Sequence, residues 1–254
     1  MMIHFVGAGS GAADLITVRG AKLLGEADVI IYAGSLVNPA LLEYAKEGAE
    51  IHNSAHMTLE QVIETMKAAE AEGKMTVRLH TGDPSLYGAH REQMDLLDEA
   101  GIEYEVVPGV SSFCGAAAAL NAEYTLPNVS QSVIITRMEG RMPVPDGEKL
   151  RKMASHGCTL VLFLSTSLLD GAVEELLAGG AYTEDTPAAI VYKATWPDQK
   201  VWRCTIGTLA ETAREAGVKN TALITIGGLL GDAYDRSRLY DPTFTHMFRK
   251  GTED

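Results

Sequence analysis

The segment 79–88, LHTGDPSLYG, combines residue types that can hold a ligand through backbone amides, a hydroxyl and a carboxylate. It follows an apolar run at 75–79 that is typical of a buried strand, and it precedes an apolar-periodic segment at 87–100 that is typical of a helix. Asp83 suits a helix N-cap and Pro84 suits the first helical position, so we expect a strand-to-helix turn. Ligands bind at the carboxyl ends of strands in open parallel sheets. Taken alone, however, the segment is better explained as an ordinary capped turn.

A first glycine loop, GAGSGA at 7–12, fits the loose dinucleotide pattern GxGxxG/A between a strand at 3–6 and a helix at 15–24. Such a loop could hold a phosphate on backbone amides at the helix N-terminus. The second strand, 28–32, carries no acid at its end to bind a ribose diol. The loop is therefore at least as consistent with a tight turn, whose glycines also let a bulky substrate approach the backbone.

Three further strands end in small or hydroxyl-bearing residues. The turn PGVSS at 108–112 follows a strand at 103–107, so Ser111 or Ser112 could cap the next helix, bind a ligand, or do both. The segments LFLST at 162–166 and AAIVYKATWPD at 188–198 repeat this pattern in the second half of the chain.

Arg137 and Arg141 lie in a loop that follows a predicted strand at 131–136 and precedes a Pro-rich segment at 143–145. A basic loop is usually only solvated, but guanidinium groups also bind carboxylates in a bidentate manner. On an acidic chain this loop is a candidate clamp for a polycarboxylate substrate.

The composition excludes several classes of function. The 254 residues include 34 acids and 21 bases, a net charge of -13, which argues against nucleic acid or an anionic membrane as the main partner. Cys114, Cys158 and Cys204 occur singly, and the histidines lack metal-ligand spacing, so we expect no disulfide framework and no metal site. The beginning of the chain lacks a basic leader, and no apolar run approaches the length of a membrane span. We expect a soluble, cytoplasmic protein.

Strands and helices alternate through the first half, which predicts a mostly parallel sheet with helices on both faces. In the second half, Pro197 and Asp198 lie between two predicted strands and suggest a hairpin, hence an antiparallel pair in a mixed sheet with helices. We therefore predict a two-domain α/β protein, with domains at 1–121 and 122–254.

In chain order, the loops VGAGSG, AGSLVNP, HTGDPSLYG, VPGVSS, LFLS and YKATWPDQ resemble those of the tetrapyrrole (corrin and porphyrin) methyltransferases. That family carries a GxGPG-type first loop, a GDP loop and a PG-[IV]-[ST]-[SA] loop. AGSLVNP and YKATWP are most similar to the precorrin-4 C(11) subgroup, which includes the cobalt-precorrin-4 enzymes. The resemblance covers essentially the whole chain, and one departure is Ser10, where many relatives have proline.

The resemblance implies a homodimer that binds S-adenosylmethionine between two domains and transfers its methyl group to C(11) of precorrin-4 or cobalt-precorrin-4 in cobalamin synthesis, releasing S-adenosylhomocysteine. It moves the cofactor away from the first glycine loop, which would face the tetrapyrrole. Asp83 is expected to orient the cofactor or a macrocycle NH. The implied cofactor contacts are Thr81, Gly82, Asp83, Leu86, Ser111, Ser112, Leu164, Tyr192 and Ala194. The expected substrate contacts are Gly9, Ser10, Ser35, Arg137 and Arg141.

The sequence is also compatible with other functions. Within the family, the substrate could be methylated at another ring position, or it could be uroporphyrinogen. From other classes, the chain could be a dinucleotide-binding oxidoreductase that uses the first glycine loop, or a tetrapyrrole carrier without activity. The sequence does not decide whether the substrate contains cobalt, because the metal would belong to the substrate.

Overall fold

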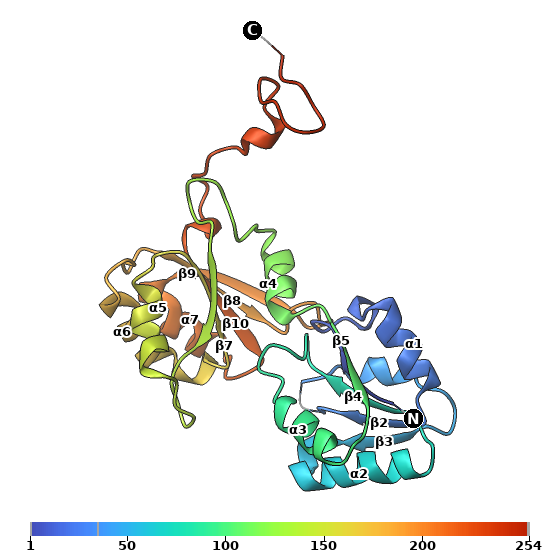
Figure 1. The fold of residues 1–254 in the computed structure, drawn as a ribbon. Coiled ribbons are helices and arrows are strands. Elements are labelled where there is room, and N and C mark those ends of the chain that lie inside the picture. The colour runs from blue at the N-terminus through green and yellow to red at the C-terminus, as the bar shows by residue number, and fades with distance from the viewer. Residues whose placement is uncertain (1, 35, 253–254) are drawn as a thin grey trace. The chain divides into compact units, whose positions relative to one another are not determined.

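The computed structural model describes residues 2–34 and 36–252, which form two compact α/β units (Figure 1). The first unit comprises Met1–Ala119 and Tyr192–Lys200, and the second comprises Leu120–Val191 and Val201–Asp254. The segment Tyr192–Lys200 thus returns to the first unit from the second half of the chain. The division into domains at residues 121 and 122 stays a prediction.

The first unit is built on a parallel five-stranded sheet with the order β3-β2-β4-β1-β5. β1 lies between β4 and β5, so the loops that follow these three strands leave the same edge of the sheet side by side. The strands are β1 (Ile3–Gly7), β2 (Val29–Tyr32), β3 (Glu50–Asn53), β4 (Thr76–His80) and β5 (Tyr104–Val107).

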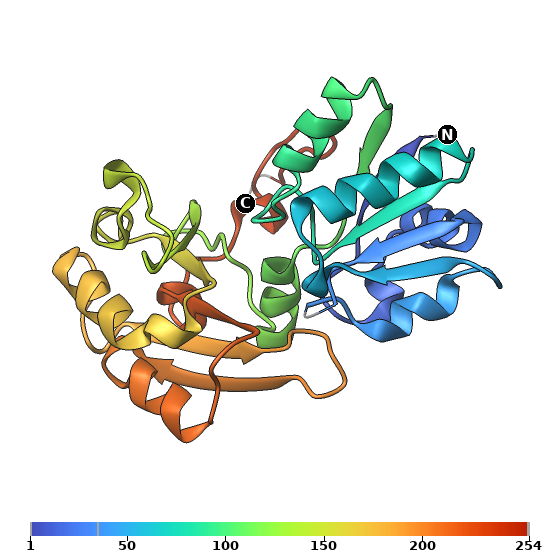
Figure 2. The same ribbon diagram turned by 90° about the horizontal axis from the view of Figure 1, so that it is seen from below.

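Helices cover both faces of this sheet, as the alternating sequence predicts (Figures 1 and 2). On one face, Leu24 of α1 (Val18–Glu26) packs in a core with Val6 and Leu79 of the strands. On the other, Met66 of α2 (Leu59–Ala71) and Leu97 of α3 (Arg91–Glu99) pack in a core with Phe5 and Ile31. The last helix is α4 (Ser112–Leu120).

One helix start differs from the prediction. A helix was expected over 87–100, after a turn with Asp83 as N-cap and Pro84 at the first helical position, but α3 begins only at Arg91. Tyr87 (φ 55°) and Ala89 (φ 47°) have left-handed backbone conformations, which interrupt any helix there. Between β2 and β3, Pro39–Tyr44 forms a 3₁₀-helix.

The second unit contains a mixed sheet with the order β6-β7-β10-β8-β9. β6 pairs with β7 in parallel and β10 pairs with β7 antiparallel, which confirms the mixed sheet. Its strands are β6 (Val133–Arg137), β7 (Thr159–Phe163), β8 (Pro187–Tyr192), β9 (Lys200–Thr205) and β10 (Ala222–Ile226), and its helices are α5 (Leu150–Ala154), α6 (Leu169–Ala178) and α7 (Leu209–Glu215).

No helix in the described part of the chain is both long and apolar enough to cross a bilayer.

Candidate functional site

Three glycines join the loops at the carboxyl edge of the first sheet. Gly7 ends β1, Gly82 lies in the loop after β4, and Gly109 lies in the loop after β5. A Cβ atom on Gly7 would come within 2.6 Å of the Gly109 Cα and 2.7 Å of the Gly82 carbonyl oxygen. The three loops can approach this closely only because no side chain separates their backbones. We call these three residues the glycine junction.

Backbone hydrogen bonds join the loops after β1 and β4. Gly9 and Gly82 form an isolated antiparallel bridge, with N–H···O distances of 3.2 Å and 3.0 Å. The Ala8 amide also donates to the carbonyl of His80 at 2.7 Å. We call the loop after β4, which contains Gly82, Asp83 and Pro84, the Gly-Asp-Pro loop. It is fixed to the first glycine loop through main-chain groups, which no change of side chain can remove directly.

The Asp83 carboxylate connects two of the loops. Its Oδ2 accepts a hydrogen bond from the Gly109 amide at 2.9 Å, and its Oδ1 accepts one from the Ser85 amide at 2.9 Å. Partial burial opposes ionisation of this carboxyl group, but the hydrogen bonds from Ser85 and Gly109 outweigh it and lower the pKa of Asp83. Asp83 therefore stays an anion that holds the loops in place, in contrast to the helix N-cap expected from its sequence context.

Thr81 offers the clearest unused binding group of this loop. Its Oγ1 is buried and has no hydrogen-bond partner among the described residues. A buried hydroxyl without a hydrogen-bond partner is costly, and a ligand that supplied a partner would recover that cost.

On the neighbouring loop, Ser111 is buried and its carbonyl accepts the amides of Cys114 and Gly115 at the start of α4. Leu86 is half-buried in the Gly-Asp-Pro loop.

Three amides of the first glycine loop, those of Ala8, Gly9 and Ala12, are engaged within the protein. The Ala12 amide donates to the Thr195 hydroxyl at 3.0 Å, and the Ser10 hydroxyl lies 3.0 Å from the same Thr195 oxygen. Together with the Ala8 and Gly9 amides described above, this leaves the loop poorly suited to cradle a phosphate. The geometry thus gives no support to the dinucleotide interpretation.

The segment Tyr192–Lys200 forms the other side of this loop. Trp196 lies against Gly11 so closely that a Cβ atom on Gly11 would be 2.5 Å from the indole Nε1. The Lys193 ammonium lies 5.2 Å from the Trp196 ring centroid and 5.4 Å from that of Tyr192, and it pairs with Asp198 at 2.6 Å. Ala194, which the family resemblance assigns to the cofactor together with Tyr192, is buried.

In the second unit, the predicted site residues gather where β6 and β7 end. Arg137 and Phe163 are register partners in this parallel pair, so Leu164 follows at the same sheet edge as Arg137. The Ser165 hydroxyl joins the two strand ends, because it donates to the Phe163 carbonyl at 2.7 Å and accepts the Met138 amide at 2.8 Å. Leu164 has a left-handed backbone (φ 53°), and 63% of its surface is exposed.

Arg137 is engaged mainly with its own loop. Its guanidinium donates to the carbonyls of Met142 at 3.0 Å and Pro143 at 2.7 Å, so it shapes the loop that carries Arg141. Arg141 itself is exposed.

The predicted site residues therefore fall into one group in each unit. Gly9, Ser10, Thr81, Gly82, Asp83, Leu86, Ser111, Ser112, Tyr192 and Ala194 belong to the first, and Leu164, Arg137 and Arg141 to the second. Ser35 lies outside the described residues. Sequence reasoning missed the structural roles of Thr195 and of Asn38, whose Nδ2 donates to the Gly11 carbonyl at 2.9 Å. Both residues occur in the motifs that carry the family resemblance, but the motif letters do not show which atoms meet.

Comparison with known families decides the assignment. Residues 2–210 match the model of the Tetrapyrrole (Corrin/Porphyrin) Methylases. The chain belongs to this family. Among curated proteins, it is 54% identical to the cobalt-precorrin-4 C(11)-methyltransferase of Methanocaldococcus jannaschii over 249 residues, covering 98% of this chain and 96% of that protein.

Solved structures of this family have the same fold. A cobalt-precorrin-4 methyltransferase of cobalamin biosynthesis, 49% identical, superposes with a TM-score of 0.88 over 91% of this chain and 96% of that chain. The uroporphyrin-III C-methyltransferase of Thermus thermophilus in complex with S-adenosylhomocysteine, 27% identical, has a TM-score of 0.76 over 91% of this chain and 93% of that chain. The two-domain α/β fold expected for this methylase is thereby confirmed.

Proposed function

We propose that this protein transfers a methyl group from S-adenosylmethionine to C(11) of precorrin-4 or cobalt-precorrin-4 in cobalamin biosynthesis. The observation that carries the proposal is the 54% identity to a cobalt-precorrin-4 C(11)-methyltransferase over nearly the whole of both chains. The name of that relative favours the cobalt-containing substrate. The metal would be part of the substrate and needs no ligand from the protein.

For the cofactor, the first unit offers a binding surface of suitable chemistry. Thr81 supplies a buried hydroxyl without a partner, and the glycine junction brings the loops after β4 and β5 together beside it. We propose that Thr81, Gly82, Leu86, Ser111 and Ser112 contact the cofactor, and that Tyr192, Ala194 and Leu164 complete the set. Asp83 would act mainly as a positioning residue, because both of its oxygens already hold loop amides.

The chemistry asks little of the protein beyond positioning. S-adenosylmethionine supplies a methyl group already activated as a sulfonium, and C(11) of the macrocycle is an enamine-like carbon nucleophile. The protein must hold these two groups in line and exclude water, an arrangement that can supply much of the rate. Rigid loops fixed by the glycine junction suit this task.

For the tetrapyrrole, we propose that its carboxylates are bound by Arg141 on the loop that Arg137 shapes. Gly9, Ser10 and Ser35 are further proposed contacts of the macrocycle. In this arrangement the Ser10 hydroxyl would keep its hydrogen bond with the Thr195 hydroxyl. Ser10 would then contact the substrate with other atoms of the loop. We further propose that the protein acts in the cytoplasm as a homodimer.

Two experiments test the function. Differential scanning should show that S-adenosylhomocysteine stabilises the protein and that NAD(P) does not. Mass spectrometry should then show a gain of one methyl group on precorrin-4, on its cobalt complex, or on both, with the site of methylation assigned by NMR. Stabilisation by NAD(P) alone would contradict the proposal. Binding of substrate without methyl transfer would instead identify a carrier.

A further inference from the structure

Residues 236–252 form a small loop that is folded by its own contacts. We call residues 236–252 the C-terminal arm (red in Figure 1). Arg249 holds it together, because its Nη2 donates to the carbonyls of Leu239 at 2.9 Å and Asp241 at 2.5 Å. Arg249 and His246 also exchange two backbone hydrogen bonds of 2.9 Å and 3.1 Å. The arm thus has a defined shape of its own.

The apolar side chains of the arm face outward. Met247 and Phe248 are each 86% exposed and Tyr240 is 82% exposed, although large apolar side chains normally seek burial. Leu239 and Phe244 of the same arm are also exposed. Several exposed apolar side chains on one ordered segment are typical of an interaction surface.

The charge of the arm restricts the partner. The arm contains four basic residues and one acid, a net charge of +3, within a chain whose net charge is -13. The basic residues are Arg236, Arg238, Arg249 and Lys250, and two acids, Glu253 and Asp254, follow them in the sequence. A surface that is apolar at its centre and acidic at its rim would complement the arm.

The first unit presents such a surface between α2 and the edge strand β3. A groove of about 740 Å³ lies there, and its apolar lining includes Ile51, Met57 and Ala68. Ile51 is 46% exposed although it belongs to a strand of the sheet. An edge strand with an exposed apolar side chain is a surface that proteins usually cover.

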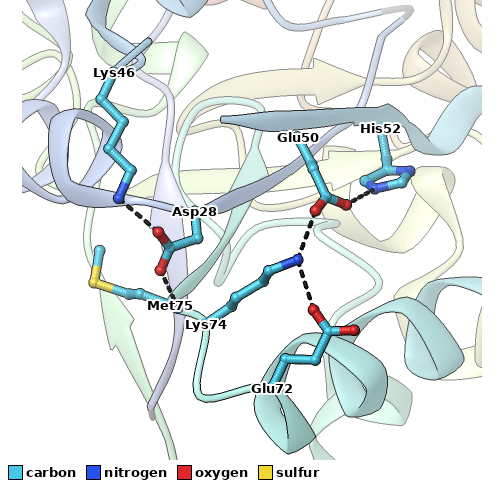
Figure 3. A network of polar contacts seen from close by, with 7 residues as sticks. All are labelled: Asp28, Lys46, Glu50, His52, Glu72, Lys74 and Met75. Carbon is cyan, nitrogen blue, oxygen red and sulfur yellow. Dashed lines mark hydrogen bonds and ion pairs between the residues drawn. The ribbon is translucent and has the colours of Figure 1, made fainter. Parts of the chain in front are cut away.

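The rim of this groove is acidic. Glu50, Glu64 and Glu72 line it with one lysine, Lys74. The Lys74 ammonium already bridges Glu50 at 2.7 Å and Glu72 at 2.6 Å, as Figure 3 shows. These hydrogen bonds raise the pKa of Lys74, and the bond from Lys74 lowers the pKa of Glu50. Three carboxylates against one ammonium leave the rim negative at neutral pH.

We propose that the C-terminal arm of one copy of this chain docks into the groove between α2 and β3 of a second copy. Met247 and Phe248 would cover the apolar lining, and Lys250 would face the acidic rim. Two-fold symmetry then gives two equivalent contacts per dimer, which is the commonest form of closed assembly. The proposal specifies the interface of the proposed homodimer and does not depend on the methyl-transfer reaction.

The first test compares arm variants of the full-length protein by analytical ultracentrifugation. The double variant Met247→Glu/Phe248→Glu should weaken dimerisation at least about tenfold, because it places charges at the centre of the interface. The matched control is Val18→Glu, since Val18 is 89% exposed but lies on α1, outside the arm and the groove. Circular dichroism and binding of S-adenosylhomocysteine should be unchanged in both variants.

The second test exchanges charges across the proposed contact. Lys250→Glu and Glu64→Lys should each weaken the dimer, and their combination should restore part of the loss. Glu215→Lys, an exposed change on α7, is the control for Glu64→Lys.

Three results would overturn the proposal. The first is a chain that stays monomeric at high micromolar concentration, and the second is a dimer whose affinity the arm variants do not change. The third is a dimer that the arm variants weaken but Glu64→Lys does not, and in which adding Glu64→Lys to Lys250→Glu restores no affinity. Because binding of S-adenosylhomocysteine is measured on the same samples, failure of the interface is distinguished from failure of the proposed function.

Discussion

The Asp83 carboxylate accepts a hydrogen bond from the Gly109 amide at 2.9 Å, although the two residues are 26 positions apart in the sequence. This bond joins the loop after β4 to the loop after β5, on either side of β1. Asp83 is half-buried and its pKa is lowered, so it is ionised at neutral pH and accepts this bond as a charged group. Charge-assisted hydrogen bonds of this kind are stronger than neutral ones.

We predict that Asp83→Ala reduces both the affinity for S-adenosylhomocysteine and the methylation rate. Loss of the hydrogen bonds to this charged group costs about 1.5–3 kcal/mol in loop positioning, or about tenfold or more in affinity. Isothermal titration calorimetry and initial rates measure the two effects. Asp95→Asn, which disturbs only an exposed ion pair on α3, is the control. An Asp83→Ala protein with full rate and full affinity would show that Asp83 does not position the site.

The glycine junction predicts that Gly109 tolerates no side chain. A Cβ atom there would be 2.8 Å from the Gly7 Cα and would also clash with the Gly82 carbonyl oxygen. We expect Gly109→Ala to lower the free energy of unfolding by about 2 kcal/mol or more, because backbone must move to make room. Gly147→Ala is the matched control, since a Cβ atom on Gly147 has open space and should change stability by less than about 0.5 kcal/mol. Urea denaturation checks both values, and equal effects would contradict the packing argument.

Much of this fold follows from local sequence patterns. The apolar runs at 28–32 and 75–79 have the length of a strand, and each is followed within a few residues by a glycine typical of a turn. These two features predict β2 and β4. Thr58 followed by Gln61 predicts a capping box at the start of α2, and both of its hydrogen bonds are present. The parallel arrangement then requires that the loops after β1, β4 and β5 share one edge.

The parts that sequence patterns missed depend on contacts between distant residues. Asp83 has the features of an N-cap, but the Gly109 amide competes for its carboxylate, and no local pattern contains that information. Likewise, Trp196 packs against Gly11, which lies 185 positions earlier, so the return of Tyr192–Lys200 to the first unit is visible only in three dimensions.

The buried His80 predicts a dependence of stability on pH. Desolvation by burial, with smaller effects of Arg78 and His90, lowers its pKa from 6.5 to about 3. The unfolded chain therefore binds one more proton than the folded chain between about pH 3 and 6.5, and stability falls as the pH falls through this window, by about 1.4 kcal/mol per pH unit. His80→Gln should remove the contribution of His80 to this slope, and His156→Gln, at an exposed position, should keep it. Urea denaturation at several pH values measures it, and identical slopes in both variants would exclude His80 as the source.

Arg78 depends on Gln93 for a hydrogen-bond acceptor. Its Nε donates to the Gln93 Oε1 at 3.1 Å, and the Gln93 Nε2 donates to the Ala89 carbonyl at 3.0 Å, so the pair ties β4 to the end of the Gly-Asp-Pro loop. Burial lowers the pKa of Arg78 to about 10, which leaves it charged at neutral pH. We expect Gln93→Leu to destabilise the protein by about 1–3 kcal/mol, because it leaves a buried charge with one acceptor fewer. Gln93→Glu should be milder, since its carboxylate can pair with Arg78. Thermal unfolding ranks the variants, and a Gln93→Glu protein less stable than Gln93→Leu would contradict this.

Thr195 holds the first glycine loop through a single hydroxyl group. Its Oγ1 accepts the Ala12 amide and meets the Ser10 hydroxyl, both at 3.0 Å, while its backbone has a left-handed φ of 67°. Because such a conformation is unfavourable for a β-branched residue, the contacts made by the hydroxyl must offset that strain. Thr195→Val keeps the shape and the strain but removes the acceptor, and we expect a loss of about 1–3 kcal/mol in unfolding free energy.

The matched control for this change is Thr221→Val. Thr221 also has a left-handed φ, 53°, but its hydroxyl bonds only to the side chain of the adjacent Asn220, at 3.2 Å among the described contacts. Its loss should cost less than about 0.5 kcal/mol. If Ser10 and its neighbours contact the tetrapyrrole, Thr195→Val should also raise the KM for the tetrapyrrole while leaving the affinity for S-adenosylhomocysteine close to that of the wild type. A variant that loses cofactor affinity and keeps its tetrapyrrole KM would place the cofactor, and not the macrocycle, against the first glycine loop.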